Sequence, residues 1–222
     1  MKRKILSLLV ALISFAGICG AKSGDSEPVI WGLKANGGML LPSNWRTNDS
    51  SFKMYNHGVD FQVGGVANIY LGRGFYFEPG VSLFYDTYKY SDLSILGETG
   101  SFSINPAIHK FGVRVPLVFG YSIGLSDTYN MSVFTGPQIG YALWGDISTT
   151  YPFGYEGDRF PTDLFGEHGH RRFDLDWRIG VGFPVTDNFV ISLEGEIGIS
   201  DLYRNDISFR ENRCTVGLTY YF

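Results

Sequence analysis

Residues 213–222 read Arg-Cys-Thr-Val-Gly-Leu-Thr-Tyr-Tyr-Phe, and apolar and polar side chains alternate along them. The apolar set, which ends on an aromatic residue, is Cys214, Val216, Leu218, Tyr220 and Phe222. Strict alternation is typical of a β-strand that separates two environments. A transmembrane β-barrel needs strands with an apolar outer face and a polar inner face. The stretch therefore predicts a membrane-spanning strand, with Phe222 covered at its end rather than in a fraying polar tail.

The same alternation recurs in seven other segments. Together they predict eight strands, over residues 31–41, 59–71, 75–86, 110–119, 131–143, 173–183, 189–200 and 213–222. We therefore expect an all-β fold, an eight-stranded antiparallel up-and-down transmembrane β-barrel. About 200 residues suffice for one such domain, here residues 22–222.

The predicted connections alternate between short and long. Three are short, at 72–74, 122–130 and 185–188, and the long polar ones cover 42–56, 91–107, 145–171 and 201–212. Outer-membrane barrels have short periplasmic turns and longer extracellular loops. Because an even number of strands returns the chain to its starting side, we expect both termini in the periplasm.

The first 21 residues have the pattern of a secretory signal peptide. A basic start, Met1-Lys2-Arg3-Lys4, precedes an apolar run over 5–18, and Ala21 offers a small residue for cleavage. The run is shorter than the roughly 20 residues of a membrane helix. Lipidation of Cys19 is the less favoured alternative, because the bulky Ile18 precedes it.

Composition agrees with an exported membrane barrel. Removal of Lys2, Arg3 and Lys4 takes the net charge from −4 to −7, so no nucleic-acid partner is expected. Aromatic residues make up 16% of the chain and there are 29 glycines, which suits strands with lipid-facing alternate positions. A soluble lipocalin-type barrel would turn its polar face outward. The small residues between the charges favour a narrow interior instead.

Charged residues recur on the predicted inner faces of the strands. They are Lys34, Asp60, Glu78, Lys110, Arg114, Asp174, Asp176, Arg178, Glu194 and Glu196. These side chains would either line a channel, supply a catalytic carboxylate pair, or fill the lumen as ion pairs. Buried charges persist when they are paired, and the mixed signs supply partners. Because a wide aqueous pore needs about 16 strands, the pattern favours a polar network that fills the lumen.

Two histidine-containing positions are candidates for chemistry. The segment 167–172 contains His168 and His170 beside Glu167, a combination that binds metal weakly; the absence of a third ligand at fixed spacing favours a solvated loop. His109, at the outer end of its strand, is the candidate for an enzyme at the extracellular rim. Spacing assigns it no partner serine or acid, so we expect no enzyme, metal or cofactor.

Aromatic residues are frequent in the long segment 145–171, which Trp144 precedes. They are Tyr151, Phe153, Tyr155, Phe160 and Phe165. Aromatic side chains are enriched at recognition surfaces, so this loop is the candidate for binding a partner. The alternative is that the same side chains fold back and cap the barrel mouth.

Prolines occur inside three predicted strands, at Pro79, Pro116 and Pro137. Each lacks the N–H that a strand donates to its neighbour. We therefore predict interrupted pairing between the third and fifth strands, at similar heights in the periplasmic half. The inward side chains next to them are the candidates for replacing the lost hydrogen bonds: Glu78, Arg114 and Gln138.

Four segments, 75–80, 113–117, 134–140 and 180–182, resemble the outer-membrane β-barrel domain of Bacteroidetes proteins, a family also called PorT-like or "porin family". The resemblance covers essentially the whole mature chain. It implies an integral outer-membrane protein that contacts lipid and is inserted by the barrel-assembly machinery, with Leu218, Tyr220 and Phe222 as the insertion signal. PorT is associated with type IX secretion, which makes a secretion component or a cell-surface protein the alternative partner.

Overall fold

The computed structural model describes residues 29–46, 51–91, 93–97, 100–104, 106–124, 130–148, 162–166, 169–203 and 208–222. The predicted signal peptide lies outside this range. Among the described residues, no helix has the length and hydropathy of a membrane span.

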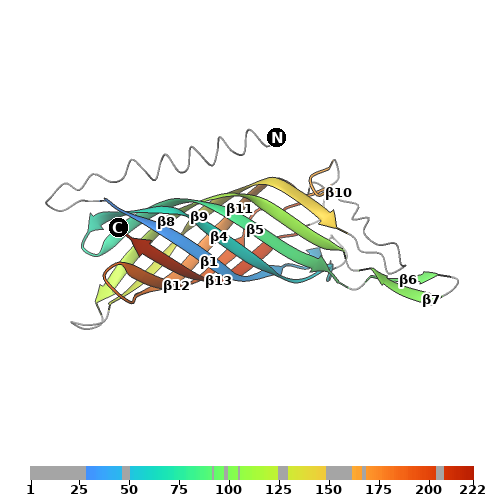
Figure 1. Ribbon diagram of the computed structural model, residues 1–222, viewed down its shortest axis with the longest axis horizontal. Coiled ribbons are helices and arrows are strands. Elements are labelled where there is room, and N and C mark those ends of the chain that lie inside the picture. The colour runs from blue at the N-terminus through green and yellow to red at the C-terminus, as the bar shows by residue number, and fades with distance from the viewer. Residues whose placement is uncertain are drawn as a thin grey trace.

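Eight long strands form a closed antiparallel barrel (Figure 1). They are β1 (Val29–Pro42), β4 (Tyr55–Gly72), β5 (Phe75–Tyr90), β8 (Ala107–Gly124), β9 (Asn130–Ser148), β11 (Phe173–Pro184), β12 (Phe189–Gly198) and β13 (Glu211–Tyr221). Each pairs with its neighbour in sequence, and the pairing of β1 with β13 closes the cylinder. The predicted eight-stranded up-and-down barrel is confirmed.

The two ends of the barrel differ. Figure 1 shows β6 (Leu93–Gly97), β7 (Gly100–Ile104) and β10 (Thr162–Asp163) at one end, among the long connections. The shorter pair β2 (Trp45–Arg46) and β3 (Ser51–Phe52) also belongs to a long connection. We call this the long-loop end and the opposite one the short-turn end. Several strands extend further at the long-loop end than their alternation predicts, since β4 begins at Tyr55 and β5 continues to Tyr90.

A tight turn joins β4 to β5 at the short-turn end. Gly72 and Gly74 have φ of 97° and 86°, and Arg73 between them has φ of 54°. Glycine adopts these left-handed conformations readily, whereas other residues seldom do. The turn was predicted from the two glycines, and the left-handed arginine between them was not.

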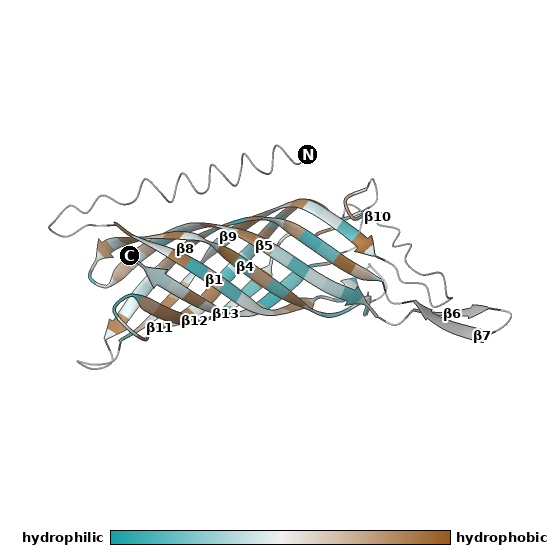
Figure 2. Cartoon of the chain, in the orientation of Figure 1, coloured by the Kyte–Doolittle hydropathy of each residue, from teal (hydrophilic) through white to brown (hydrophobic). Residues whose placement is uncertain are grey.

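Hydrophilic and hydrophobic residues alternate along the strands (Figure 2), and buried and exposed side chains alternate with them, as the sequence predicted. In β13 the inward Arg213 and Thr215 are buried, whereas the outward Leu218 is 47% exposed and Phe222, directly after the strand, is 68% exposed. Soluble monomers seldom expose large continuous apolar surfaces. An apolar exterior around a charged interior is the arrangement of a membrane-spanning barrel, and it excludes the lipocalin-type alternative.

The strand ladders are interrupted at all three prolines. The gaps at Pro116 and Pro137 lie between the third and fifth long strands, as predicted, whereas the gap at Pro79 lies between the second and third. The missing rungs are Ala67–Pro79 and Asn68–Glu78 between β4 and β5, Gly80–Pro116 and Val81–Val115 between β5 and β8, and Leu117–Pro137 and Val118–Gly136 between β8 and β9. In each case these two rungs are the ones that need the N–H that proline lacks. The register is the same on both sides of each gap, so the interruptions are not bulges.

Candidate functional site

The lumen contains a buried network of charged side chains at mid-height. All eight residues predicted for a lumen network belong to it: Lys34, Asp60, Glu78, Arg114, Asp176, Arg178, Glu194 and Glu196. Lys110 and Asp174, also expected to face inward, join the same network. Counting Asp86, Glu211 and Arg213, the described lumen holds five cationic and eight acidic side chains.

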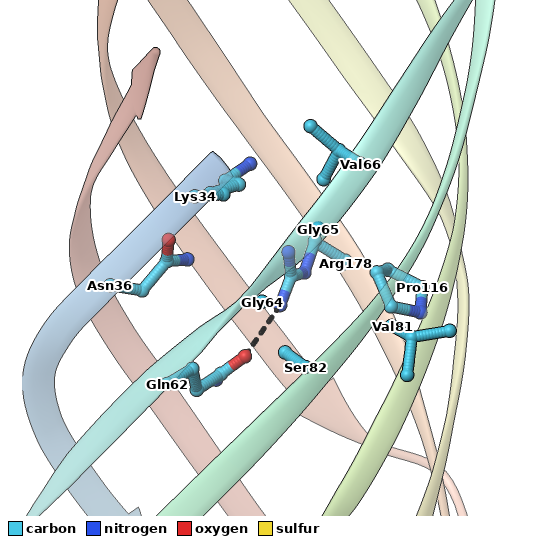
Figure 3. Close-up of a pocket in the computed structure, with 10 residues that line it drawn as sticks. All are labelled: Lys34, Asn36, Gln62, Gly64, Gly65, Val66, Val81, Ser82, Pro116 and Arg178. Atoms are coloured by element: carbon cyan, nitrogen blue, oxygen red, sulfur yellow. Dashed lines mark hydrogen bonds between the residues drawn. The ribbon is translucent and has the colours of Figure 1, made fainter. Parts of the chain in front are cut away.

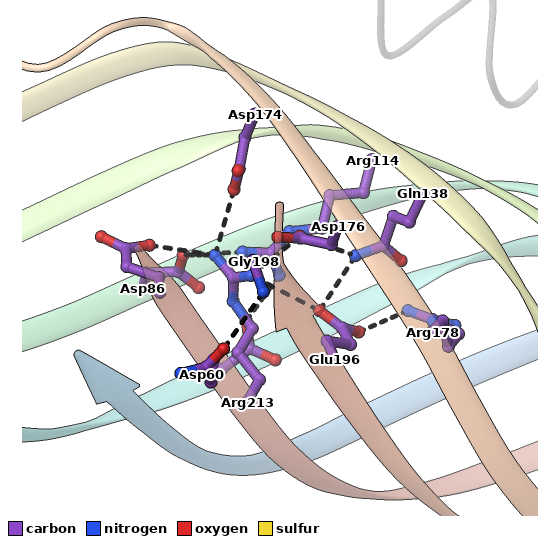
Figure 4. Close-up of polar contacts among 12 residues, drawn as sticks. Asp60, Asp86, Arg114, Gln138, Asp174, Asp176, Arg178, Glu196, Gly198 and Arg213 are labelled. Atoms are coloured by element: carbon purple, nitrogen blue, oxygen red, sulfur yellow. Dashed lines mark hydrogen bonds and ion pairs between the residues drawn. The ribbon is translucent and has the colours of Figure 1, made fainter. Parts of the chain in front are cut away.

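Arg213 on β13 is the centre of this network (Figure 4). Its guanidinium lies within 4 Å of six carboxylates, at 2.9 Å from Asp176, 3.0 Å from Glu211 and 3.2 Å from Asp86. The others are Asp60, Asp174 and Glu196, at 3.5–3.6 Å. Arg213 was not among the predicted network residues, although it lies on the same strand face as Thr215 and Thr219. Its place in the alternation was the signal that would have identified it.

Arg114 on β8 joins two carboxylates that face each other across β4 and β5. Asp60 and Asp86 are directly paired in the ladder, an arrangement that is destabilising for like charges. The Arg114 guanidinium lies 2.5 Å from Asp60 and 2.7 Å from Asp86, and its positive charge offsets their repulsion. Its other side stacks on Phe84, 3.9 Å from the ring centre.

A second group of pairs extends the network toward the short-turn end. Arg178 lies 2.7 Å from Glu196 and 3.2 Å from Glu194, and Lys34 lies 2.7 Å from Glu194. Glu78 accepts a hydrogen bond from the Tyr221 hydroxyl. The amides of Asn36, Gln62 and Gln138 donate to the same carboxylates. These contacts rigidify the interior because each carboxylate is held from several strands.

The proposed repair of the proline gaps is wrong. Glu78, Arg114 and Gln138 point inward next to the prolines, but their side chains bind other side chains of the network. Two described side-chain contacts lie at or beside a gap. Asn68 Nδ2 donates to Glu78 Oε2 at 3.4 Å across the missing Asn68–Glu78 rung. The Ser82 hydroxyl donates to the Arg114 carbonyl at 3.5 Å next to the gap at Pro116. The ion-pair network attracts these polar groups more strongly than single backbone acceptors do.

An aromatic cluster closes the lumen at the long-loop end, and we call it the cap. Its members are Leu40, Tyr55, Phe84, Tyr88, Ile108 and Ala142 from the strands with Leu164, Phe165, Leu202, Tyr203 and Phe209 from the connections. The Tyr55 and Tyr203 hydroxyls hydrogen-bond at 2.5 Å, and Trp45 packs against Tyr203 at 4.6 Å. Three long connections are therefore fixed to one another across the mouth.

His170 lies inside the cap. It is 1% exposed, its ring packs against Tyr203 at 4.6 Å and Phe209 at 5.6 Å, and neither ring nitrogen has a hydrogen-bond partner in the described structure. Burial lowers the pKa of His170 from 6.5 to about 3. The prediction of a solvated loop is thus wrong for His170. Glu167 and His168 lie outside the described residues. Within the part of the chain that the structure describes, no group of three His, Cys, Asp or Glu side chains could hold a metal ion.

Phe165 is likewise buried in the cap, with the Arg172 guanidinium 4.3 Å from its ring. Phe165 is one of the five loop aromatics considered for partner recognition. Its position agrees with the alternative, in which the side chain folds back and caps the barrel mouth. Tyr151, Phe153, Tyr155 and Phe160 lie outside the described residues.

A smaller apolar cluster, the plug, closes the lumen at the short-turn end. It consists of Tyr76, Val118 and Phe134, and the Lys34 ammonium lies 5.3 Å above the Phe134 ring. Beside Lys34 and Arg178 of the network lies a cavity of about 20 Å³, which Asn36 and Gln62 also line (Figure 3). Such a volume holds about one water molecule. The described side chains therefore fill the lumen and leave no wide channel.

The structure gives His109 partners that spacing could not assign. Its Nδ1 lies 2.9 Å from the Tyr85 hydroxyl and its Nε2 lies 3.3 Å from Ser148 Oγ. All three side chains are on the outward face at the long-loop end, and Asp146 is the cross-strand neighbour of His109. In serine–histidine–acid sites a carboxylate hydrogen-bonds to the histidine ring and orients it. Here the Tyr85 hydroxyl takes that place, so the hydrogen-bonding partner that orients the His109 ring is uncharged.

Fold and lumen together define the class: a membrane-spanning β-barrel with a side-chain-filled interior. Residues 26–204 match the family described as "Outer membrane protein beta-barrel domain", and the chain belongs to this family. It is thus an outer-membrane β-barrel protein. No curated protein matches the sequence.

Several solved structures are similar to this chain. Neisserial surface protein A (NspA) shares 10% identity over 88% of this chain and 100% of its own, with a TM-score of 0.48. Ail of Yersinia pestis, in complex with the heparin analogue sucrose octasulfate, shares 13% identity over 86% of this chain and 99% of its own, with a TM-score of 0.42. OprG of Pseudomonas aeruginosa shares 10% identity over 86% and 95%, with a TM-score of 0.42.

Proposed function

We propose that the protein is a non-enzymatic integral outer-membrane barrel with a structural or recognition role, and that its filled lumen serves as a rigid support for long extracellular loops. In this proposal residues 1–21 are a cleaved signal peptide. The short-turn end and both termini face the periplasm, as the lengths of the connections favour. The outer-membrane lipid and the barrel-assembly machinery are its partners.

The observation that carries this proposal is the closure of the lumen at three levels. The cap, the Arg213-centred network and the plug follow one another along the axis, and the cavity beside Lys34 and Arg178 of the network is water-sized. A transported solute would have to displace all three.

Two measurements test the support role. We expect an unboiled sample to migrate differently from a boiled one on a gel, as a detergent-stable barrel does. The same preparation, inserted in planar lipid bilayers, is expected to show no stepwise conductance. A regular open-channel current from the folded form would contradict a filled lumen and favour transport.

Recognition through the loops is the more specific form of the proposal. The cap holds three connections together, so the segment 145–171 is presented from a fixed base. Preorganised loops bind with a smaller entropy cost. A PorT-like component of type IX secretion, or an adhesin, would use this surface.

Co-purification from outer membranes separates the two roles. Deletion of residues 150–160 leaves Phe165 and His170 in the chain, and we expect it to remove a bound partner without loss of heat-modifiability. Deletion of the β6–β7 hairpin, 93–104, is the matched control at the same end. If the intact protein retains no partner, the structural role is favoured.

A further inference from the structure

An apolar groove lies on the outward surface of the barrel, in its short-turn half. Its volume is about 540 Å³, within the range of roughly 300–1,000 Å³ that is usual for small-molecule sites. Residues from five strands line it, among them Phe119, Tyr121, Val133, Thr135, Ile179 and Leu193. Phe134 of the plug also contributes to its lining, and none of its lining residues belongs to the long connections.

The sizes of the side chains explain the hollow. Val133 and Thr135 present small outward side chains on β9, whereas Phe119 on β8 and Ile179 on β11 are large and more than half exposed. The Thr135 hydroxyl accepts a hydrogen bond from Trp177 Nε1 at 2.8 Å and donates to the Arg178 carbonyl at 3.1 Å. Because this hydroxyl is already hydrogen-bonded, a ligand that covers Thr135 does not have to desolvate an unpaired polar group there, and most of the remaining lining side chains are apolar.

A cation lies beyond one end of the groove, at the edge of the barrel. The Tyr121 ring packs against Phe75 at 4.7 Å, and a Cβ at Gly74 would lie 3.0 Å from it, so the ring lies against the β4–β5 turn. Arg73 in this turn is exposed and keeps the left-handed φ of 54°. Non-glycine residues in this conformation concentrate at functional sites. A guanidinium also matches the geometry of phosphate.

We propose that this groove binds one phospholipid of the periplasmic leaflet, with an acyl chain along Val133 and Thr135 and its phosphate at Arg73. The choice of leaflet rests on the membrane orientation proposed above. Acyl chains are what surrounds this outward surface in a bilayer, and the combination of an apolar groove with one cation at its edge matches a single lipid.

Photo-crosslinking tests the site. The protein is reconstituted in phosphatidylethanolamine–phosphatidylglycerol vesicles that contain a phospholipid with a diazirine on its acyl chain, and the labelled residues are mapped by mass spectrometry. We expect labels to concentrate on residues 119–135 and 179–193. Val133→Trp fills the groove and should reduce them several-fold. Val216→Trp, at a similarly outward position on β13, is the matched control and should leave them unchanged.

A second set of variants tests the proposed contact between Arg73 and the lipid phosphate. Arg73→Gln should reduce labelling, Arg73→Lys should retain most of it, and added glycerol phosphate should not compete, since the acyl chain supplies most of the binding. Competition by glycerol phosphate would assign Arg73 to a free phosphate instead. Labels spread evenly around the barrel, or unaffected by Val133→Trp, would overturn the site. Heat-modifiability of each variant shows that the barrel itself is intact.

Discussion

At the scale of single residues, Arg213 has the largest expected effect on stability. Arg213→Met removes one of five lumen cations and leaves Asp86, Asp176 and Glu211 without their shared partner. Breaking a buried pair by removing one partner costs about 3–5 kcal/mol. We expect a correspondingly lower urea midpoint for unfolding in detergent.

Arg210→Met is the matched control for Arg213. Arg210 pairs with Asp201 at 3.2 Å on the surface, where its side chain is 47% exposed. Exposed pairs contribute about 0–1 kcal/mol, so this variant should unfold almost like the parent. Equal effects of the two substitutions would show that Arg213 does not organise the lumen.

Ser148 tests the non-enzymatic assignment. Ser148 contacts Nε2 of His109, but the other ring nitrogen of His109 is hydrogen-bonded to the Tyr85 hydroxyl and not to a carboxylate. We therefore expect a fluorophosphonate probe to leave the folded protein unlabelled at Ser148. Labelling that disappears in Ser148→Ala and His109→Ala would instead identify a serine nucleophile at the rim.

At the scale of elements, we expect the cap to make the long-loop end sensitive to acid. The pKa of His170 is about 3 in the folded protein against an ordinary 6.5. Between these values the unfolded form binds the proton and the folded form does not, so stability is lost as pH falls from about 6.5 toward 3. Tyr55, Tyr203 and Phe209 surround the ring, and Lys110 and Glu211 are the charges that act on it.

His170→Phe should therefore reduce the acid sensitivity of the cap. Limited proteolysis of the loops at pH 7 and pH 4.5 measures it: the parent should be cut faster at pH 4.5, and the variant should change less. His57→Phe, at an exposed position of β4, is the control and should behave like the parent. An unchanged acid response in His170→Phe would place the sensitive group elsewhere.

The strand ladders give a second prediction at this scale. Pro116→Ala supplies an N–H opposite the Gly80 carbonyl, where the ladder now lacks a rung. We expect the amide at position 116 to be as protected from hydrogen exchange as that of Val115. The lost rung arises from the missing donor alone, because the register is unchanged across the gap. Rapid exchange at position 116 would mean that the backbone there is displaced as well.

The fold could be predicted from the alternation of apolar and polar residues. Successive side chains of a strand point to opposite faces, so a period of two separates lipid-facing from lumen-facing residues. The same alternation places Asp60, Glu196 and Arg213 on the inner face. It could not show which of the inward charges meet, because a contact such as that of Arg213 with Asp60 links strands that are not neighbours. The cap was not predictable from periodicity either. His170 and Phe209 lie in connections without a repeat, and their burial depends on how three loops meet.

At the scale of the whole molecule, we predict that assembly depends on the outward face at the edge where β13 meets β1. Phe222 donates its backbone N–H to the Trp31 carbonyl at 2.9 Å, and its side chain is outward beside Tyr220, at 5.5 Å between ring centres. Aromatic girdles occupy this level of a membrane barrel. Phe222→Asp places a charge there. We expect export across the inner membrane to continue, while the heat-modifiable form in the outer membrane decreases.

Phe222→Trp is the conservative control, because it keeps an aromatic ring at the interface. We expect it to assemble like the parent, and fractionation with antibody detection measures both forms. Leu218 and Tyr220 lie on the same face, so the effect of Phe222→Asp should grow when Tyr220→Asp is added. Normal outer-membrane levels of the double variant would show that this face is not read during insertion, and that closure of β13 against β1 suffices.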